Sequence, residues 1–331
     1  MVKKKGIGVW FAVIVFTILV SVLGTTYFFG VGPFTQERTK LVVSTTTSLY
    51  DTGLLDVIET QFEEQYLIDV YFISAGTGIA IEYAKRGDAD MILVHSPPQE
   101  FDFIKDGFGV CRKIIAYNFF SIVGFTDDPA NISGTTLVQA LTRIVDMGRE
   151  GEVEWISRGD NSGTHTKEKN LWSIVGFDLN ELRNEEWYIE SGTGMGNTLQ
   201  IADEKKAYTL ADIGTYLKYY NDGLISLEVQ IEQIPDMLNV YSAIAVNKNY
   251  NPQANFNAAI TFIKYLASTD GQQLLTEYGM TTYSRSLFFP AVQLLTQNTD
   301  STLTQWIENY AYFNGEECPI EYQDNHPELY R

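Results

Sequence analysis

Ser44-Thr45-Thr46-Thr47-Ser48 lies between an apolar run at 41–43 and an amphipathic segment at 52–65. The apolar run predicts a buried strand, and the helical period of the apolar residues in the second segment predicts a helix. A turn between a strand and a helix N-terminus presents free N–H groups and the positive end of the helix dipole. Because the hydroxyl groups add donors, this stretch predicts an α/β unit whose turn can hold an oxyanion.

The same arrangement of strand, polar turn and helix returns four times along the chain. The later turns are Ser74-Ala75-Gly76-Thr77-Gly78, His95-Ser96-Pro97-Pro98, Ser157-Arg158-Gly159-Asp160-Asn161-Ser162-Gly163-Thr164-His165 and Ser191-Gly192-Thr193-Gly194-Met195-Gly196. Each turn alone is ordinary helix-capping chemistry. Five of them in one chain, one with the guanidinium of Arg158, indicate a cleft lined by neutral donors and one cation. The P-loop and GxGxxG spacings are absent, so nucleotide binding is not indicated.

Alternating strands and helices indicate an α/β fold with mostly parallel sheets. We expect strands at 41–43, 70–73, 91–94, 114–117, 119–125, 154–157, 187–189 and 239–246, and helices at 52–65, 77–86, 98–106, 135–149, from 164, 194 and 211, and at 256–267, 271–278 and 303–310. The long apolar strands at 119–125 and 239–246 suggest a middle domain inserted into the first, with these strands as the hinge. We therefore expect lobe 1 at 40–118 plus 247–331 and lobe 2 at 119–246.

The first 30 residues carry three lysines and then a charge-free apolar stretch from Gly6 to Gly30. This length suits a membrane-spanning helix, and the lysines before it put the N-terminus inside the cell and the rest of the chain outside. We expect residues 1–30 to be an uncleaved anchor, with a signal cleaved near Gly24 as the alternative, and 31–39 to be a linker.

The net charge of −19 argues against nucleic acid as a partner. It also requires any anion site to act locally, which screening over about 10 Å allows. The two cysteines, Cys111 and Cys318, could pair outside the cell, and the sequence leaves this open. With three histidines and no metal-ligand spacing, we expect neither a metal cation nor a cofactor.

Together the turns resemble those of the tungstate-binding proteins of ABC transporters, the TupA type. The resemblance covers residues 41–290 and rests on the five turns together with Tyr50-Asp51-Thr52-Gly53-Leu54-Leu55, Gly87-Asp88-Ala89-Asp90 and Ala207-Tyr208-Thr209-Leu210-Ala211-Asp212. It implies a type II periplasmic-binding-protein fold, in which two α/β lobes are joined by a two-strand hinge and enclose a ligand cleft. It also implies delivery of tungstate to the permease subunits of an ABC importer.

The resemblance further implies which residues contact the anion. The candidates are Thr45, Thr46, Thr47, Ser48, Ser74, Gly76, Thr77, Arg158, Ser162, Gly163 and Thr164, to which the fifth turn adds Ser191 and Thr193. A preference for tungstate over molybdate comes from the resemblance alone, because the two ions are tetrahedral dianions of the same shape. The chain departs from the family pattern at its ends, with the long N-terminal apolar run and an acidic, tyrosine-rich tail after 290.

Other functions stay open at this point. A receptor for molybdate, phosphate or sulfate would share the fold, and a phosphate receptor would need an acceptor such as Asp160 or Asp212 facing the ligand. An exported phosphate-ester hydrolase would use His165 as a base, but the chain has no GxSxG elbow. The third alternative is a sensor lobe that works without a transporter, because a permease and an ATPase would be separate chains. We expect a binding protein outside the cytoplasm, tethered to the membrane, and not an enzyme.

Overall fold

The computed structural model describes residues 37–330, most of which belong to the compact unit Thr39–Arg331. The anchor predicted at 1–30 lies outside the described residues. Among the residues described, no helix is both long and apolar enough to cross a bilayer.

Ten strands form one mixed sheet within this unit. They are β1 (Thr39–Thr46), β2 (Ile68–Ala75), β3 (Met91–Val94), β4 (Gly109–Gly124), β5 (Trp155–Ser157), β6 (Tyr188–Glu190), β7 (Tyr208–Asp212), β8 (Glu228–Ile231), β9 (Leu238–Val246) and β10 (Phe289–Pro290). The order is β2-β1-β3-β9-β4-β7-β5-β6, with β8 and β10 paired to β4. β1 pairs in parallel with β2 and β3, and β5 pairs in parallel with β6 and β7. The ladders that include β4 or β9 are antiparallel.

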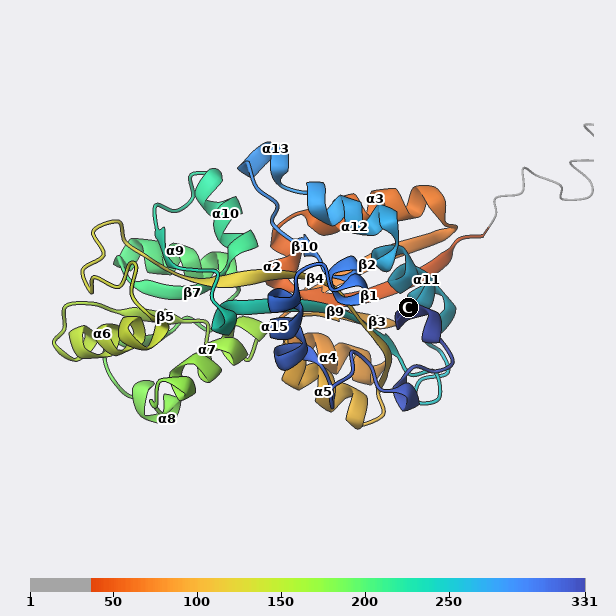
Figure 1. Cartoon of the computed structure of the whole chain (residues 1–331), viewed down its shortest axis with the longest axis horizontal. Helices are drawn as coiled ribbons and strands as arrows, with labels where there is room; N and C mark the ends of the chain where they lie inside the picture. The colour runs from red at the N-terminus through yellow and green to blue at the C-terminus, as the bar shows by residue number, and fades with distance from the viewer. Residues whose placement is uncertain (1–36, 331) are drawn as a thin grey trace, which may run out of the picture. The chain divides into compact units, whose positions relative to one another are not determined.

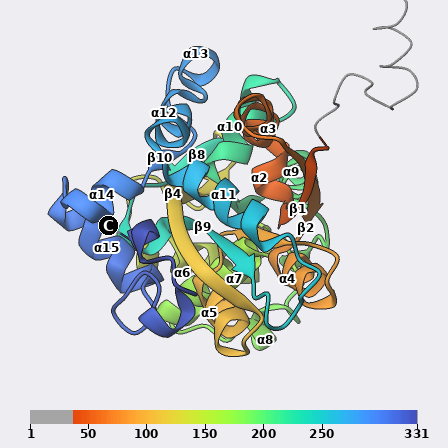
Figure 2. The same ribbon diagram turned by 90° about the vertical axis from the view of Figure 1, so that its right-hand side faces the viewer.

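The helices that follow these strands cover both faces of the sheet. They are α2 (Thr47–Asp51), α3 (Leu54–Gln65), α4 (Thr77–Arg86), α5 (Pro97–Lys105), α6 (Leu137–Arg149), α7 (Gly163–Ile174), α8 (Leu179–Leu182), α9 (Met195–Lys205), α10 (Ile213–Asn221), α11 (Phe256–Ala267), α12 (Thr269–Glu277), α13 (Met280–Tyr283), α14 (Val292–Gln297) and α15 (Ser301–Ala311). Figures 1 and 2 show α3 and α12 on one side of the β1–β3 region and α4 and α5 on the other.

The buried apolar residues explain this layering. One core cluster joins α3 and α11 to one face of β1 and β9, and another joins α4 and α5 to the opposite face of β3 and β9. At the β5–β7 end, α6 and α7 pack in one cluster, and α9 and α10 pack in a second. Every residue of β4 and β9 is buried, including polar residues such as Asn118 and Asn239, because helices cover both faces of these strands.

Several expected elements are present with the expected bounds, among them β3, α4 and α11. The two strands expected at 114–117 and 119–125 are one strand, β4, because its ladder with β9 runs on past Asn118. The expectation of mostly parallel pairing is wrong for the centre of the sheet, where the β4 and β9 ladders are antiparallel. The strands β7, β8 and β10 were not expected.

The two long strands run through the middle of the unit, as Figure 1 shows for β4 and β9. The N-terminal part of β4 pairs with β9, and its C-terminal part pairs with β7 and β8. The apolar residues of α14 and α15 pack in the same cluster as Phe120 and Trp155. The lobe boundaries at 118 and 247 stay a prediction.

Candidate anion-binding site

The first polar turn joins β1 to α2. Thr46 is the N-cap of α2, because its hydroxyl accepts a hydrogen bond from the Leu49 N–H. Thr47 is the first helical residue and is half-buried. Its hydroxyl accepts a hydrogen bond from Arg158 Nη2 at 3.3 Å, although 111 residues separate the two. The structure therefore brings the first and fourth predicted turns together.

Arg158 lies in the loop between β5 and α7 and is 1% exposed. The same Nη2 atom also pairs with the Asp160 carboxylate. Asp160 accepts a second hydrogen bond from the Ser162 N–H at 3.2 Å, which closes the loop on itself. The guanidinium is thus a buried cation whose position is fixed by its own loop and by Thr47.

The second and fifth turns lie beside the contact between the first and fourth turns. The Gly163 N–H donates to the Thr77 hydroxyl at 3.1 Å, which joins the β2–α4 turn to the start of α7. A Cβ atom at Gly76 would lie 3.6 Å from Asp160, and one at Gly194 would lie 3.6 Å from Thr47 Oγ1. A Cβ atom at Gly163 would lie 3.0 Å from the His95 ring, so the third turn lies here too and all five predicted turns are neighbours in space.

Besides α2, the helices α4, α7 and α9 begin at these turns. The Ser162 hydroxyl caps α7 by accepting a hydrogen bond from the His165 N–H. The caps of α4 and α9 are Gly76 and Gly194, which have no side chain to accept the first N–H groups of these helices. Uncapped N–H groups at the positive ends of helix dipoles favour a negative ligand.

Buried polar atoms beside these turns lack a partner. Arg158 Nε, Thr164 Oγ1 and His165 Nε2 have no hydrogen-bond partner among the described residues. A buried polar group without a partner costs about 1–3 kcal/mol. The Arg158 N–H and the Thr164 hydroxyl are donors, so acceptor atoms of a ligand would remove this cost.

The two carboxylates that the sequence offered as ligand acceptors are engaged inside the protein. Asp160 accepts hydrogen bonds from Arg158 and Ser162. Asp212 is fully buried, caps α10 and accepts from the N–H and the hydroxyl of Thr215 at 2.9 and 2.8 Å. Burial raises the pKa of Asp212 to about 6, and the hydrogen bonds from Thr215 oppose this shift. Each carboxylate therefore already accepts two hydrogen bonds from protein donors.

A buried carboxylate behind Arg158 holds β5 against α7. Glu168 accepts hydrogen bonds from Trp155 Nε1 at 2.7 Å and from the Ser157 hydroxyl at 2.8 Å. It also accepts from Trp172 Nε1 at 3.2 Å and from the Tyr188 hydroxyl. Because Ser157 directly precedes Arg158, this set of bonds fixes the base of the arginine loop.

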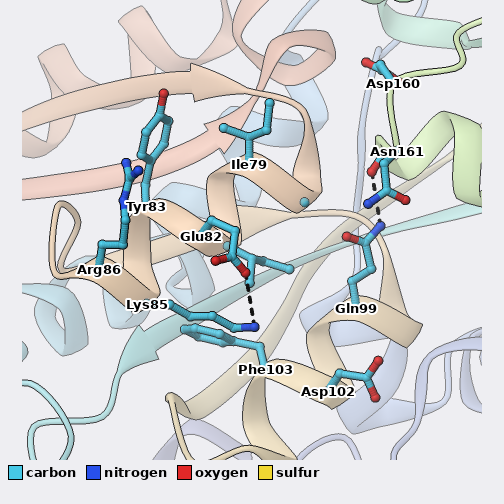
Figure 3. Close-up of a pocket in the computed structure, with 12 residues that line it drawn as sticks. Ile79, Glu82, Tyr83, Lys85, Arg86, Gln99, Asp102, Phe103, Asp160 and Asn161 are labelled. Atoms are coloured by element: carbon cyan, nitrogen blue, oxygen red, sulfur yellow. Dashed lines mark hydrogen bonds and ion pairs between the residues drawn. The ribbon is translucent and has the colours of Figure 1, made fainter.

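A second contact joins α5 to the fourth turn, as Figure 3 shows. Gln99 Nε2 donates to the Thr166 hydroxyl at 2.9 Å and lies 3.5 Å from the Asn161 carbonyl oxygen. A pocket of about 560 Å³ opens beside this contact. Its lining includes Glu82 and Lys85, which pair at 3.3 Å. The wall of this pocket carries charges of both signs, whereas the turns combine helix N-termini with Arg158, so the turns remain the candidate site.

The other predicted site residues have different surroundings. The Thr45 hydroxyl donates to the Leu93 carbonyl inside the sheet, and Ser74 is exposed on the edge strand β2. The Ser191 hydroxyl contacts Thr198 Oγ1 at 2.8 Å and the Arg158 carbonyl at 3.3 Å. Thr193 accepts from Asn197. Of these four hydroxyls, only that of Ser191 takes part in a contact between turns, and the role of all four in binding stays a prediction.

Two histidines border the site. His95 Nε2 lies 3.2 Å from the Ser48 hydroxyl, a contact the sequence did not predict beyond placing both residues in turns after strands. His165 Nδ1 accepts a hydrogen bond from the Asn161 N–H at 3.0 Å, so this nitrogen is not oriented by a carboxylate as in a catalytic triad. Burial lowers the pKa of His165, with the Lys169 charge as a further cause. Among residues 37–330, no group of three or more His, Cys, Asp or Glu side chains could hold a metal ion.

Several known proteins are similar to this chain in sequence and in structure. A family model described as PBP superfamily domain matches residues 33–270. The tungstate-binding protein TupA of Peptoclostridium acidaminophilum is 38% identical over 259 residues, which cover 77% of this chain and 87% of that protein. The solved structure of tungstate-binding protein TupA from Desulfovibrio alaskensis G20 superposes with a TM-score of 0.65 at 36% identity, covering 76% of this chain and 99% of that one. A structure titled as the tungstate ABC transporter from Geobacter sulfurreducens gives the same TM-score at 38% identity, covering 72% and 98%.

The mixed sheet with helices on both faces is thus the type II fold of the periplasmic-binding-protein class. Within this class, the chain belongs to the TupA family of ABC-transporter binding proteins, which confirms the resemblance seen in the sequence.

Proposed function

We propose that this protein captures tungstate outside the cytoplasm and delivers it to the permease of an ABC importer. The names of its TupA relatives support the ligand and the transporter partnership. The expected contacts are the N–H groups at the starts of α4 and α9, the Arg158 guanidinium and the Thr164 hydroxyl.

The observation that carries this proposal is the pair of unpartnered buried donors, Arg158 Nε and Thr164 Oγ1. Arg158 lies in the loop before α7 and contacts Thr47, whereas Thr164 lies in the first turn of α7, next to the Gly163 N–H that donates to Thr77. Both donors lie beside helix starts capped only by glycine. A tetrahedral dianion offers four acceptor oxygens and no hydrogen. Its oxygens would accept hydrogen bonds from these donors, and it has no hydrogen that would require a neighbouring acceptor.

The hydrogen bonds already accepted by Asp160 and Asp212 favour a fully ionised anion over phosphate as the ligand. Phosphate carries a hydrogen near neutral pH and needs an acceptor for it, whereas Asp160 and Asp212 are each engaged by two protein donors. Molybdate and sulfate meet the same requirement as tungstate, so only the relatives' names favour tungstate among the three.

The proposed mechanism is closure of two lobes, 40–118 plus 247–331 and 119–246, about β4 and β9. The hydrogen bond between Arg158 and Thr47 would then join the lobes directly across the ligand. Residues 1–30 would tether the protein to the membrane, so that the cleft stays near its permease.

Calorimetric titration of residues 31–331 with tungstate, molybdate, sulfate and phosphate in one phosphate-free buffer tests the proposal. We expect tight one-to-one binding of tungstate, weaker binding of molybdate, and no heat from phosphate. Binding of phosphate alone would overturn the ligand assignment and the reasoning about acceptors. No heat from any of the four anions would overturn the binding function.

A further inference from the structure

A line of buried polar side chains runs from the first turn through both long strands. The Ser48 hydroxyl lies 3.2 Å from His95 Nε2, and His95 Nδ1 lies 2.8 Å from Asn239 Oδ1. Asn239 Nδ2 donates to Asn118 Oδ1 at 2.8 Å, and Asn118 Nδ2 donates to the Leu287 carbonyl at 3.1 Å. The four side chains are each no more than 1% exposed. Asn118 and Asn239 are direct partners in the ladder between β4 and β9.

The direction of every hydrogen bond in this line follows from its last member. A backbone carbonyl such as that of Leu287 can only accept, so Asn118 must turn its NH₂ group toward it and its oxygen toward Asn239. Asn239 must then donate to Asn118, which leaves its own oxygen for His95. His95 therefore carries its hydrogen on Nδ1.

The protonation of the remaining nitrogen of His95 determines the direction of its hydrogen bond with the Ser48 hydroxyl. Burial lowers the pKa of His95 to about 4, so the ring is neutral near pH 7 and its Nε2 has no hydrogen. Nε2 must accept, and the Ser48 hydroxyl must donate to it. The Thr46 hydroxyl, 3.3 Å from Ser48 Oγ, can then donate to Ser48. The Ser48 hydroxyl hydrogen thus points toward His95, and that of Thr46 can point toward Ser48.

We propose that His95, Asn239 and Asn118 are positioning residues, which fix the Ser48 hydroxyl and with it the first turn of the anion site. Ser48 then acts through the conformation of the turn and not as a donor to the anion. This inference rests on the proposed function, because it assigns a role within the same site.

The chain provides a matched pair of variants. Asn239 uses its second NH₂ hydrogen to donate to the Tyr241 hydroxyl at 2.9 Å. Asn239→Leu removes the acceptor of His95, whereas Tyr241→Phe removes a buried hydrogen bond of Asn239 that does not lie between His95 and Ser48. Both changes are buried in β9, so a general effect on packing should appear in both.

The test combines ¹⁵N NMR of the histidine rings with anion titration, on the full chain and the two variants. His95→Asn assigns the His95 signal among the three histidines. In the unmodified protein we expect the hydrogen of His95 on Nδ1. In Asn239→Leu we expect it to move to Nε2, with a fall in tungstate affinity of about 2- to 12-fold, the range for one neutral hydrogen bond. Tyr241→Phe should keep both the tautomer and the affinity.

Each possible failure has its own signature. An unmodified protein with the hydrogen on Nε2 overturns the inference directly, whether or not Asn239→Leu folds. Unchanged affinity in folded Asn239→Leu, or an equal loss in Tyr241→Phe, overturns the positioning role while the proposed function stands. An unmodified protein that binds none of the four anions overturns the proposed function instead, and the positioning role with it.

Discussion

Replacement of Arg158 by alanine should weaken anion binding strongly while the protein stays folded. The magnitude follows from the atoms that are available. Nη2 is already engaged by Thr47 and Asp160, whereas Nε has no partner among the described residues, so one charge-assisted bond to the anion is counted. Such a bond contributes about 1.5–3 kcal/mol, and its loss raises Kd about 10- to 150-fold.

The fold should tolerate this change. Asp160 loses its cationic partner but keeps the hydrogen bond from the Ser162 N–H, and its side chain is 17% exposed, so water can reach it. Arg158→Lys keeps the charge without the planar fork of donors and should give an intermediate affinity. Arg149→Ala is the control, because Arg149 is half-exposed and its ion pair with Glu185 belongs to the surface class that contributes about 0–1 kcal/mol.

The assay is calorimetric titration with tungstate, together with a thermal unfolding curve for each variant. Affinity should fall in the order unmodified protein, Arg158→Lys, Arg158→Ala, and Arg149→Ala should bind as the unmodified protein does. A folded Arg158→Ala protein with unchanged Kd would refute the assignment of Arg158 to the site. Equal weakening in Arg149→Ala would show that net charge, and not a positioned donor, sets the affinity.

Three further predictions concern stability and thiol chemistry. Burial lowers the pKa of His95 from 6.5 to about 4, so the unfolded state binds the extra proton and the free energy of unfolding falls as the pH drops from 6.5 to 4. Urea titrations should show this fall reduced by about 3 kcal/mol in His95→Gln, and an undiminished fall would contradict a buried, neutral His95. Glu168→Leu removes the acceptor of four buried donors and should lower the free energy of unfolding in urea by about 3 kcal/mol or more. Glu168→Gln keeps an acceptor and should lower it less. Equal unfolding midpoints for the two variants would contradict the role given to Glu168. Cys111 and Cys318 are free and buried, and burial raises the pKa of both thiols. A thiol reagent should therefore label them slowly in the native protein and fully after unfolding without reductant. No labelling after unfolding would show that the two cysteines are paired.

The sequence predicted the elements whose signals are local. The bounds of α4 and β3 agree because an apolar period marks the helix, the left-handed Gly87 ends it, and a short apolar run marks the strand. β7 was missed, since its short run at 208–212 follows a helix directly and its pairing with β4 is a long-range contact. β8 was missed for a related reason, because only one of its four residues is buried and its pattern resembles a loop.

The candidate site was predictable as a set of turns but not as an arrangement. Gly, Ser and Thr before the helices identified turns that do meet in space. Which atoms meet depends on contacts across the fold, such as Thr47 with Arg158 or Thr77 with Gly163. The role of His95 depends on Asn239, which is 144 residues away. No local pattern contains that information.

The acidity of the chain and the neutrality of its site are consistent with each other. With a net charge of −19, the long-range field repels anions, so capture depends on donors within about one screening length of the ligand. Asp160 offsets the charge of Arg158, which leaves N–H and hydroxyl dipoles as the main attraction. Arg158 and Ser162 donate to Asp160 and Thr215 donates to Asp212, so we expect an anion that brings its own hydrogen to compete with these bonds for an acceptor. We therefore expect selection against protonated oxyanions, and we expect it to persist in any variant that keeps these bonds.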